Sequence, residues 1–241
     1  MSLSHSPLIV RDGLVLCLDA ANPRSYPKSG TTWSDLAGAN DGTLTNGPTF
    51  DADDKGSIVF DGSNDYVYVS TSDDLNFAGE SNITISCWVK MNSRNDLNTF
   101  IMWEDRVNLN GRELRIGCSV NDGYQCLFQF FKSPGGNSNS VSAKGTTSLL
   151  ANVYYSAVGT FNGSIICLYL NGSLEGTTNV TGTIQPPEAG TNARWIFGAG
   201  ELNESDRFLN GNMSNVSIYN RALTASEVLQ NYNATRGRYG I

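Results

Sequence analysis

The side chains that could carry out catalysis are few and scattered along this 241-residue chain. Retaining glycoside hydrolysis needs two carboxylates about 5 to 5.5 Å apart, and alternating positions on a strand point the same way. No apolar run carries such a pair, because Glu104 and Asp105 are adjacent and Glu113 stands alone. The only histidine, His5, lies in the N-terminal tail, so neither a Ser-His-Asp triad nor a histidine metal site is expected. We therefore predict that the protein is not an enzyme.

Sugar binding demands less of a sequence than catalysis does. An exposed aromatic ring can stack on a sugar face while neighbouring polar groups bind the hydroxyls. Trp103, with Asp105 and Arg106 close behind it, is the first candidate, and Tyr124 at a hairpin tip is the second. For Trp103, packing in the core fits the sequence equally well. The other tryptophans are predicted core residues: Trp33, Trp88 and Trp195.

The charge of the chain argues against a nucleic acid partner. The net charge is -7 and the isoelectric point is about 4.7, whereas phosphate backbones attract a dense basic surface. Hydrophobic residues make up 39% of the chain, which is enough for a core. The sequence shows no secretory signal and no apolar stretch long enough to span a bilayer, so no membrane partner is expected.

Short strands and tight turns account for most of the chain. In residues 83–90 apolar and polar side chains alternate with the period of a strand. Asn-Gly pairs at Asn162 and Asn171 are suited to the positive φ angles that tight hairpin turns require. We also expect residues 57–62 and 66–69 to form a strand pair joined by a turn. These patterns predict an all-β domain.

One segment near the C-terminus has helical character. Thr224 and Glu227 have the spacing of a capping box, with Val228, Leu229 and Tyr232 following on one face. A single short helix is therefore expected to dock on the β domain.

The two ends of the chain are candidate arms. Residues 1–12 are predicted to form an N-terminal arm, and residues 13–241 the folded domain. The basic, aromatic end at residues 236–241 could likewise reach out to a partner.

Five cysteines leave at least one without a disulfide partner, and each lies in an apolar run. Buried free thiols that act as small hydrophobic side chains are the main expectation. If residues 121–123 form a three-residue hairpin loop, Cys118 and Cys126 lie directly opposite each other. A disulfide between these two is the alternative.

Four stretches, in their order and spacing, resemble the laminin-G-like or concanavalin-A-like jelly-roll family. They are Phe60–Val67, Ile83–Lys90, Gly159–Gly172 and Phe208–Leu223. The resemblance implies a jelly-roll β-sandwich of two antiparallel sheets with one short C-terminal helix. Segments 13–23 and 231–239 are similar to copies found in bacteriophage virion proteins.

The resemblance implies a non-catalytic binding or structural module, such as a virion decoration, fibre or tail protein with a carbohydrate-binding role. Its implied partners are other virion structural proteins, host-surface glycans and further copies of the chain. The implied location is the virion, which is assembled in the host cytoplasm and exposed outside the cell. A stand-alone calcium-dependent lectin is the alternative, and a glycoside hydrolase is a more distant one.

A calcium site of the laminin-G-like or pentraxin-like kind would lie at one rim of the sandwich. Such a site uses acidic side chains and backbone carbonyls as ligands. The matching positions are Asn108, Asn110, Glu201, Asn203 and Asp206. Their acidic spacing is irregular, so a solvated acidic loop is the alternative.

Overall fold

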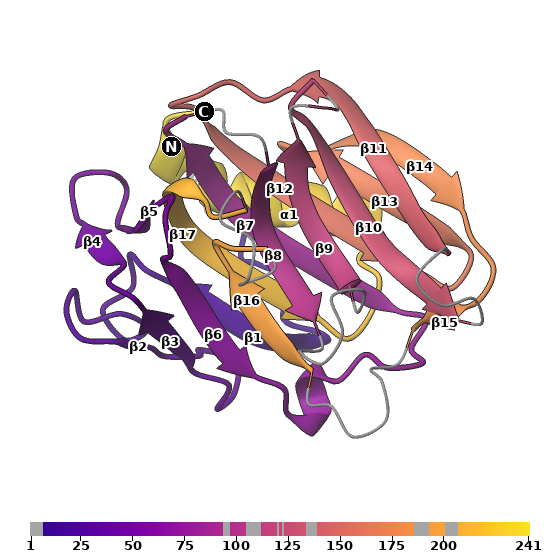
Figure 1. The fold of residues 1–241 in the computed structure, drawn as a ribbon, viewed down its shortest axis with the longest axis horizontal. Helices are drawn as coiled ribbons and strands as arrows, with labels where there is room; N and C mark the ends of the chain where they lie inside the picture. The colour runs from indigo at the N-terminus through magenta and orange to yellow at the C-terminus, as the bar shows by residue number, and fades with distance from the viewer. Residues whose placement is uncertain are drawn as a thin grey trace, which may run out of the picture.

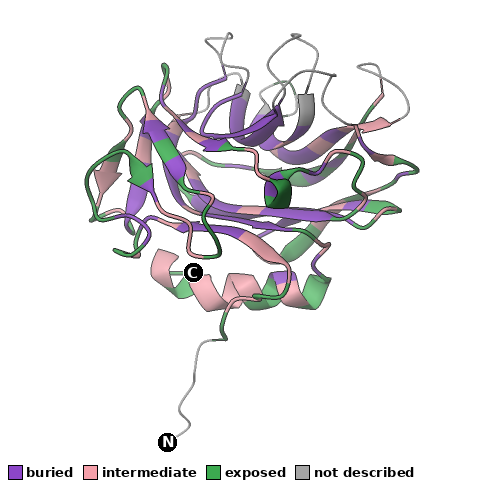
Figure 2. Cartoon of the chain, turned by 90° about the horizontal axis from the view of Figure 1, so that it is seen from below, coloured by how far each residue is buried: buried purple, intermediate pink, exposed green. Residues whose placement is uncertain are grey.

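The computed structural model describes residues 7–93, 97–104, 112–119, 121, 123–133, 139–185, 193–200 and 207–241. Over these residues the chain forms two sheets packed face to face, with a helix outside one of them (Figures 1 and 2). We call the sheet beside the helix the helix-bearing sheet and the other one the second sheet. The predicted jelly-roll sandwich with one short C-terminal helix is confirmed.

The helix-bearing sheet runs in the order β14-β13-β12-β7-β17-β5-β4, and β1 also pairs with β17. Its strands are β1 (Leu14–Asp19), β4 (Thr49–Asp51), β5 (Ser57–Asp61), β7 (Ile83–Met91), β12 (Tyr154–Phe161), β13 (Ile165–Leu170), β14 (Ser173–Asn179) and β17 (Asn210–Tyr219). The pairings that build this sheet are antiparallel.

The second sheet runs in the order β11-β10-β9-β8-β16-β6-β3-β2, and β15 pairs with β10. Its strands are β2 (Thr32–Trp33), β3 (Gly42–Thr45), β6 (Tyr66–Ser70), β8 (Leu97–Glu104), β9 (Arg112–Ser119), β10 (Gln125–Ser133), β11 (Ser140–Ser148), β15 (Thr183–Ile184) and β16 (Arg194–Phe197). The described residues also form the 3-10 helices Asp73–Leu75 and Arg236–Tyr239 and the helix α1 (Ala225–Thr235).

The core lies between the sheets and follows the period-two pattern of the strands. In β7, Ile83, Ile85 and Cys87 belong to the inter-sheet core, as the alternation predicts. The largest side chains that are fully buried include Trp33, Trp103, Trp195, Phe128, Phe130 and Phe161. Trp88 is also buried, at 2% exposure, but its ring lies on the outer face of the sheet beneath the C-terminal residues.

The predicted hairpins form, but Phe161 pairs with Ile166, so the turn at Asn162 and Gly163 is longer than the two-residue turn that this pair predicts. Asn171 and Gly172 join β13 to β14 with φ angles of 50° and 77°. At the other Asn-Gly pair only Gly163 has a positive φ, while the Asn162 side chain accepts the backbone N–H groups of Ser164 and Ile165. An asparagine can thus stabilise a turn through its side chain as well as through its own backbone.

Cys118 and Cys126 occupy directly opposite positions on β9 and β10, as the three-residue loop predicts. Neither cysteine forms a disulfide in the structure, and both are buried, at 4% and 2% exposure. The arrangement agrees with buried thiols that pack as small hydrophobic side chains.

The expected strand pair formed by residues 57–62 and 66–69 is wrong. β5 pairs with β4 and β17 in the helix-bearing sheet, whereas β6 pairs with β3 and β16 in the second sheet. The turn between them is stabilised by Asp65, whose carboxylate accepts the backbone N–H of Asp61 at 3.1 Å. This local hydrogen bond is compatible with a turn that connects strands of two different sheets as well as with a hairpin turn.

The C-terminal helix begins with the predicted capping box. The Thr224 hydroxyl accepts the backbone N–H of Glu227, whose carboxylate accepts the backbone N–H of Thr224. Val228 packs with Tyr219 and Leu223 against the outer face of the helix-bearing sheet. No helix in the described ranges is long and apolar enough to cross a membrane.

The predicted C-terminal arm is wrong. Residues 236–239 form a 3-10 helix that folds back on the sheet, where Tyr239 stacks on Trp88. Arg238 forms an ion pair with Asp19 of β1. The aromatic and basic residues that suggested an outward arm are instead bound by the chain's own outer face.

Candidate functional site

Trp103, the first predicted sugar-stacking residue, is a core residue. Its side chain is 0% exposed, and its ring stacks on Trp195 with centroids 6.1 Å apart. The indole N–H donates a 3.3 Å hydrogen bond to the hydroxyl of Thr71. Because β8 directs the ring between the sheets, no face is left for a ligand, and the predicted glycan contact of Trp103 is wrong.

Most other predicted ligand residues lie outside the described residues. These are Asp105, Arg106, Asn108, Asn110, Glu201, Asn203 and Asp206. Their roles in glycan or calcium binding stay predictions. Within the ranges that the structure describes, no three His, Cys, Asp or Glu side chains come together in a way that could hold a metal ion.

Tyr124 lies at the tip of the β9–β10 hairpin, as predicted, with a φ of 59° and a half-buried side chain. Its role in glycan binding stays a prediction.

Glu104 takes part in a buried ion pair. Nε of Arg194 donates a 2.9 Å hydrogen bond to Oε1 of Glu104, and Nη2 donates to the same oxygen. The two side chains are only 8% and 7% exposed. A carboxylate neutralised in this way is suited to a structural role, because removing it would leave an uncompensated buried charge.

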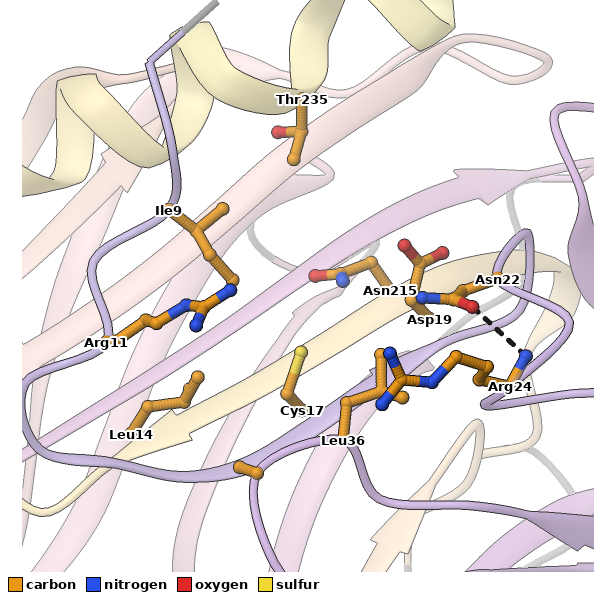
Figure 3. A pocket seen from close by; sticks show the side chains of 11 residues that line it. Ile9, Arg11, Leu14, Cys17, Asp19, Asn22, Arg24, Leu36, Asn215 and Thr235 are labelled. Atoms are coloured by element: carbon orange, nitrogen blue, oxygen red, sulfur yellow. Dashed lines mark hydrogen bonds between the residues drawn. The ribbon is translucent and has the colours of Figure 1, made fainter.

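A groove of about 560 Å³ lies on the outer face of the helix-bearing sheet (Figure 3). Its floor is made by β1 and β17. In β1, Leu16 and Leu18 point into the core, so the alternating Cys17 and Asp19 point outward. Asp19 pairs with Asn215 of β17, which also lines the groove. Strand alternation therefore places a thiol, a carboxylate and an amide on one floor.

The walls come from the segments that flank β1. Ile9 and Arg11 precede the strand, while Asn22 and Arg24 follow it (Figure 3). The remaining lining residues are Leu14, Leu36, Ala37 and Thr235. The last of these belongs to the C-terminal turn of α1, so the helix forms part of the rim.

The N-terminal wall is tied to the C-terminal helix. The backbone N–H of Val10 donates to Oδ1 of Asn231 at 2.7 Å, and the Tyr219 hydroxyl donates to the carbonyl of Val10 at 3.0 Å. The Gln230 amide donates to the carbonyl of Leu8 at 2.7 Å. The described part of the predicted N-terminal arm thus lies against the domain and shapes the groove.

Three polar side chains of the groove have no hydrogen-bond or ion-pair partner among the described residues. They are Arg11, Arg24 and Asn215. Figure 3 shows Arg11 and Arg24 extending toward the middle of the groove from opposite sides, with Asn215 on the floor. Polar groups that converge over a partly apolar surface are typical of small-ligand sites.

The acid on the floor is already paired. Arg238 donates two hydrogen bonds to Asp19, from Nη1 at 2.7 Å and from Nη2 at 2.8 Å. Burial lowers the pKa of Arg238, but the Asp19 carboxylate outweighs burial and raises this pKa above its ordinary value. Burial, with the nearby charge of Asp19, raises the pKa of the Cys17 thiol to about 11. The thiol is therefore neutral near pH 7 and a poor nucleophile.

The sequence predictions did not identify this groove. Arg11 and Arg24 belong to no recognisable motif, and Asn215 comes from a distant part of the chain. One signal was visible, the alternation of Leu16 and Leu18 with Cys17 and Asp19. That pattern predicts which side chains of β1 point outward, but it does not predict which segments surround them.

Residues 61–229 match the family model described as the concanavalin A-like lectin/glucanases superfamily. No curated protein matches the chain.

Solved structures share the fold at low sequence identity. The binding domain of Paraclostridial Mosquitocidal Protein 1 aligns with a TM-score of 0.69 and 19% identity, over 93% of this chain and 52% of that one. The binding domain of Botulinum Neurotoxin DC in complex with SialylT aligns with a TM-score of 0.67 and 14% identity, over 93% of this chain and 52% of that one. Trypanosoma rangeli sialidase aligns with a TM-score of 0.65 and 16% identity, over 94% of this chain and 33% of that one.

The chain spans about half the length of the two toxin domains and a third of the sialidase. At these identities the likeness concerns the fold, which is that of lectin-like domains. The family match over residues 61–229 and the two packed antiparallel sheets show that this chain belongs to the concanavalin A-like lectin/glucanases superfamily.

Proposed function

We propose that this chain is a non-catalytic carbohydrate-binding module and that the groove beside β1 holds the saccharide. The observation that carries the proposal is the convergence of Arg11, Arg24 and Asn215, which lack partners in the described chain, on one concave surface. The groove volume of about 560 Å³ lies within the range usual for small-ligand sites, roughly 300 to 1,000 Å³.

The chemistry of the groove suits a sugar. A saccharide presents hydroxyls to polar side chains and C–H faces to apolar ones. The Asn215 amide can donate and accept hydrogen bonds, and each arginine offers a planar set of donors. Ile9 and Leu14 supply apolar contacts at the same site.

The arrangement of carboxylates supports binding without catalysis. Asp19 is the only acidic side chain among the described residues that line the groove, and it is paired with Arg238. The two-carboxylate mechanism of glycoside hydrolysis therefore has no pair to use there. Outside the groove, the carboxylate of Glu104 is bound to Arg194.

We also propose a place for the module on a bacteriophage virion, as a decoration, fibre or tail protein. This role rests on the resemblance of segments 13–23 and 231–239. Because residues 236–241 pack back toward the sandwich, we expect contacts with other virion proteins to use the folded surface. Mass spectrometry of purified particles tests this role, and particles that lack the protein would rule it out.

A glycan array probed with the purified protein, with and without calcium, tests the binding function. Ala37 is exposed at the groove rim, so Ala37→Trp should block the site with little effect on folding. Leu174→Trp, at a position 55% exposed on β14, is the matched control. We expect binding that Ala37→Trp abolishes and Leu174→Trp preserves.

The glycan array tests the binding function, whereas the blocking variant tests the location of the site. An array without any bound glycan in either condition rejects the binding function. Full binding by Ala37→Trp rejects the groove as the site. Binding that requires calcium would favour the calcium-dependent lectin.

A further inference from the structure

The acidic side chains around the groove are already neutralised or bonded. Asp19 carries two hydrogen bonds from Arg238, and Asp12 is 2.9 Å from Nε of Arg221. Asp35 accepts the backbone N–H groups of Cys17, Ala37 and Asn40, at 2.8, 2.9 and 3.2 Å. These carboxylates are thus bound to other parts of the chain.

Arg11 and Arg24 are different. Both are exposed, both line the groove, and neither has a carboxylate partner in the described part of the chain. The protein has 23 acidic and 16 basic side chains, so two unpaired arginines at one site stand out against the acidic whole. With Asp19 compensated by Arg238, the groove carries a local positive charge.

We propose that the groove selects saccharides that carry a carboxylate, such as sialic or uronic acids. This inference rests on the proposed carbohydrate-binding function and adds the ligand class. The planar guanidinium fork matches a carboxylate through two parallel hydrogen bonds, so one arginine binds the acid. The other arginine adds charge attraction, and the amide of Asn215 is placed to bind a hydroxyl or acetamido group.

The position of α1 favours a carboxylate over a phosphate ester, which carries more negative charge near pH 7. Multiply charged phosphate groups are commonly held at helix N-termini, where backbone N–H groups point outward. This groove instead meets α1 at Thr235, in its C-terminal turn, where the helix dipole is negative. A singly charged carboxylate that lies between Arg11 and Arg24 avoids that end of the helix.

Titration calorimetry with matched sugars tests the selection. The probes are 3′-sialyllactose against lactose, and trigalacturonic acid against galactotriose, with lactose 3′-sulfate as a third anion. We expect at least one carboxylated sugar to bind about tenfold or more tightly than its neutral parent at low salt. That advantage should shrink as salt is raised, because part of it is charge attraction.

Arginine variants assign the preference to the groove. Arg11→Gln and Arg24→Gln should each lower affinity for the carboxylated sugar far more than affinity for the neutral parent, and so remove most of the advantage of the carboxylated sugar. Arg24→Lys keeps the positive charge but loses the planar guanidinium group, so it should keep only part of the preference for the carboxylated sugar. Arg236→Gln removes an exposed arginine outside the groove and should change nothing.

The outcomes separate this inference from the function on which it rests. Equal affinity for neutral and carboxylated sugars, equal binding of the sulfate, or insensitivity to both Arg→Gln variants overturns the carboxylate preference but leaves a carbohydrate-binding module. Absence of binding to every sugar, neutral ones included, overturns the proposed function itself. Circular dichroism melting of each variant confirms that any loss is not unfolding.

Discussion

The ring of Tyr239 stacks on the indole of Trp88, with centroids 3.8 Å apart and planes inclined by 16°. Nε1 of Trp88 donates a 2.9 Å hydrogen bond to the hydroxyl of Thr235. Two residues separated by most of the chain thus join the C-terminal end to β7. The contact covers the outer face of the helix-bearing sheet and holds Arg238 beside the groove.

Replacing Tyr239 with alanine should destabilise the protein by about 2 kcal/mol, because a large aromatic contact is lost. It should also shift tryptophan emission to the red. Trp33, Trp103 and Trp195 are 0% exposed in the core, so the shift would come from Trp88 as its indole gains contact with water. Tyr239→Phe keeps the ring and serves as the control. Unchanged emission from Tyr239→Ala would contradict the stacked arrangement.

Stability should fall in acid as Glu227 becomes protonated. Hydrogen bonds from Arg221, aided by those from Thr224, lower the pKa of Glu227 from 4.5 to about 2. A carboxyl group with a lowered pKa stabilises the folded state above its unfolded pKa and loses that effect as pH falls toward the folded one. The expected loss between pH 4.5 and 2 is on the order of 1 kcal/mol, because the side chain is partly exposed. Urea unfolding across this range measures it.

The control for this pH effect is Glu227→Gln. That variant should be less stable than the parent at pH 7, and its stability should depend less steeply on pH below 4.5. If both proteins respond equally to acid, Glu227 is not responsible.

Glu175 should stabilise the contact between the edge strands of the two sheets. Its carboxylate, on β14, accepts the backbone N–H groups of Thr146 and Thr147 on β11 at 2.8 and 3.0 Å. Both hydroxyls donate as well, at 2.9 and 2.7 Å. Burial raises the pKa of Glu175, but these hydrogen bonds outweigh burial and lower it.

Glu175→Ala should cost about 1 kcal/mol, since the site is largely exposed to water. It should also speed hydrogen exchange at the amides of Thr146 and Thr147. Ser173→Ala, at an exposed position on the same strand, is the matched control. If hydrogen exchange at these two amides does not change, water replaces the carboxylate and Glu175 does not stabilise the edge strand β11.

The thiols should react in two stages with a disulfide reagent. Burial raises the pKa of Cys87 and of Cys126, so these thiols are neutral and shielded at pH 8. Cys167, which is only partly buried, should react first in the native protein. All five thiols should titrate after denaturation. A total of three would instead indicate a disulfide between Cys118 and Cys126.

Local patterns predicted the features that local interactions stabilise. The capping box of Thr224 and Glu227 joins residues three apart, so its donors and acceptors are visible in the sequence. The register of Cys118 and Cys126 follows from the length of one loop. The same local reasoning failed for β5 and β6, because a turn does not specify which distant strand will accept each one's hydrogen bonds.

The sequence by itself determined the all-β class, the hairpins and the C-terminal helix, since these depend on periodicity and on neighbours along the chain. The resemblance to the family was carried by the order and spacing of four stretches. Only the tertiary structure decided that Trp103 is buried and that Tyr239 packs on Trp88. It alone brought Arg11, Arg24 and Asn215 to one groove. The physical reason is that strand pairing joins residues about 200 positions apart, as with Cys17 and Ser217, and no local pattern records such a contact.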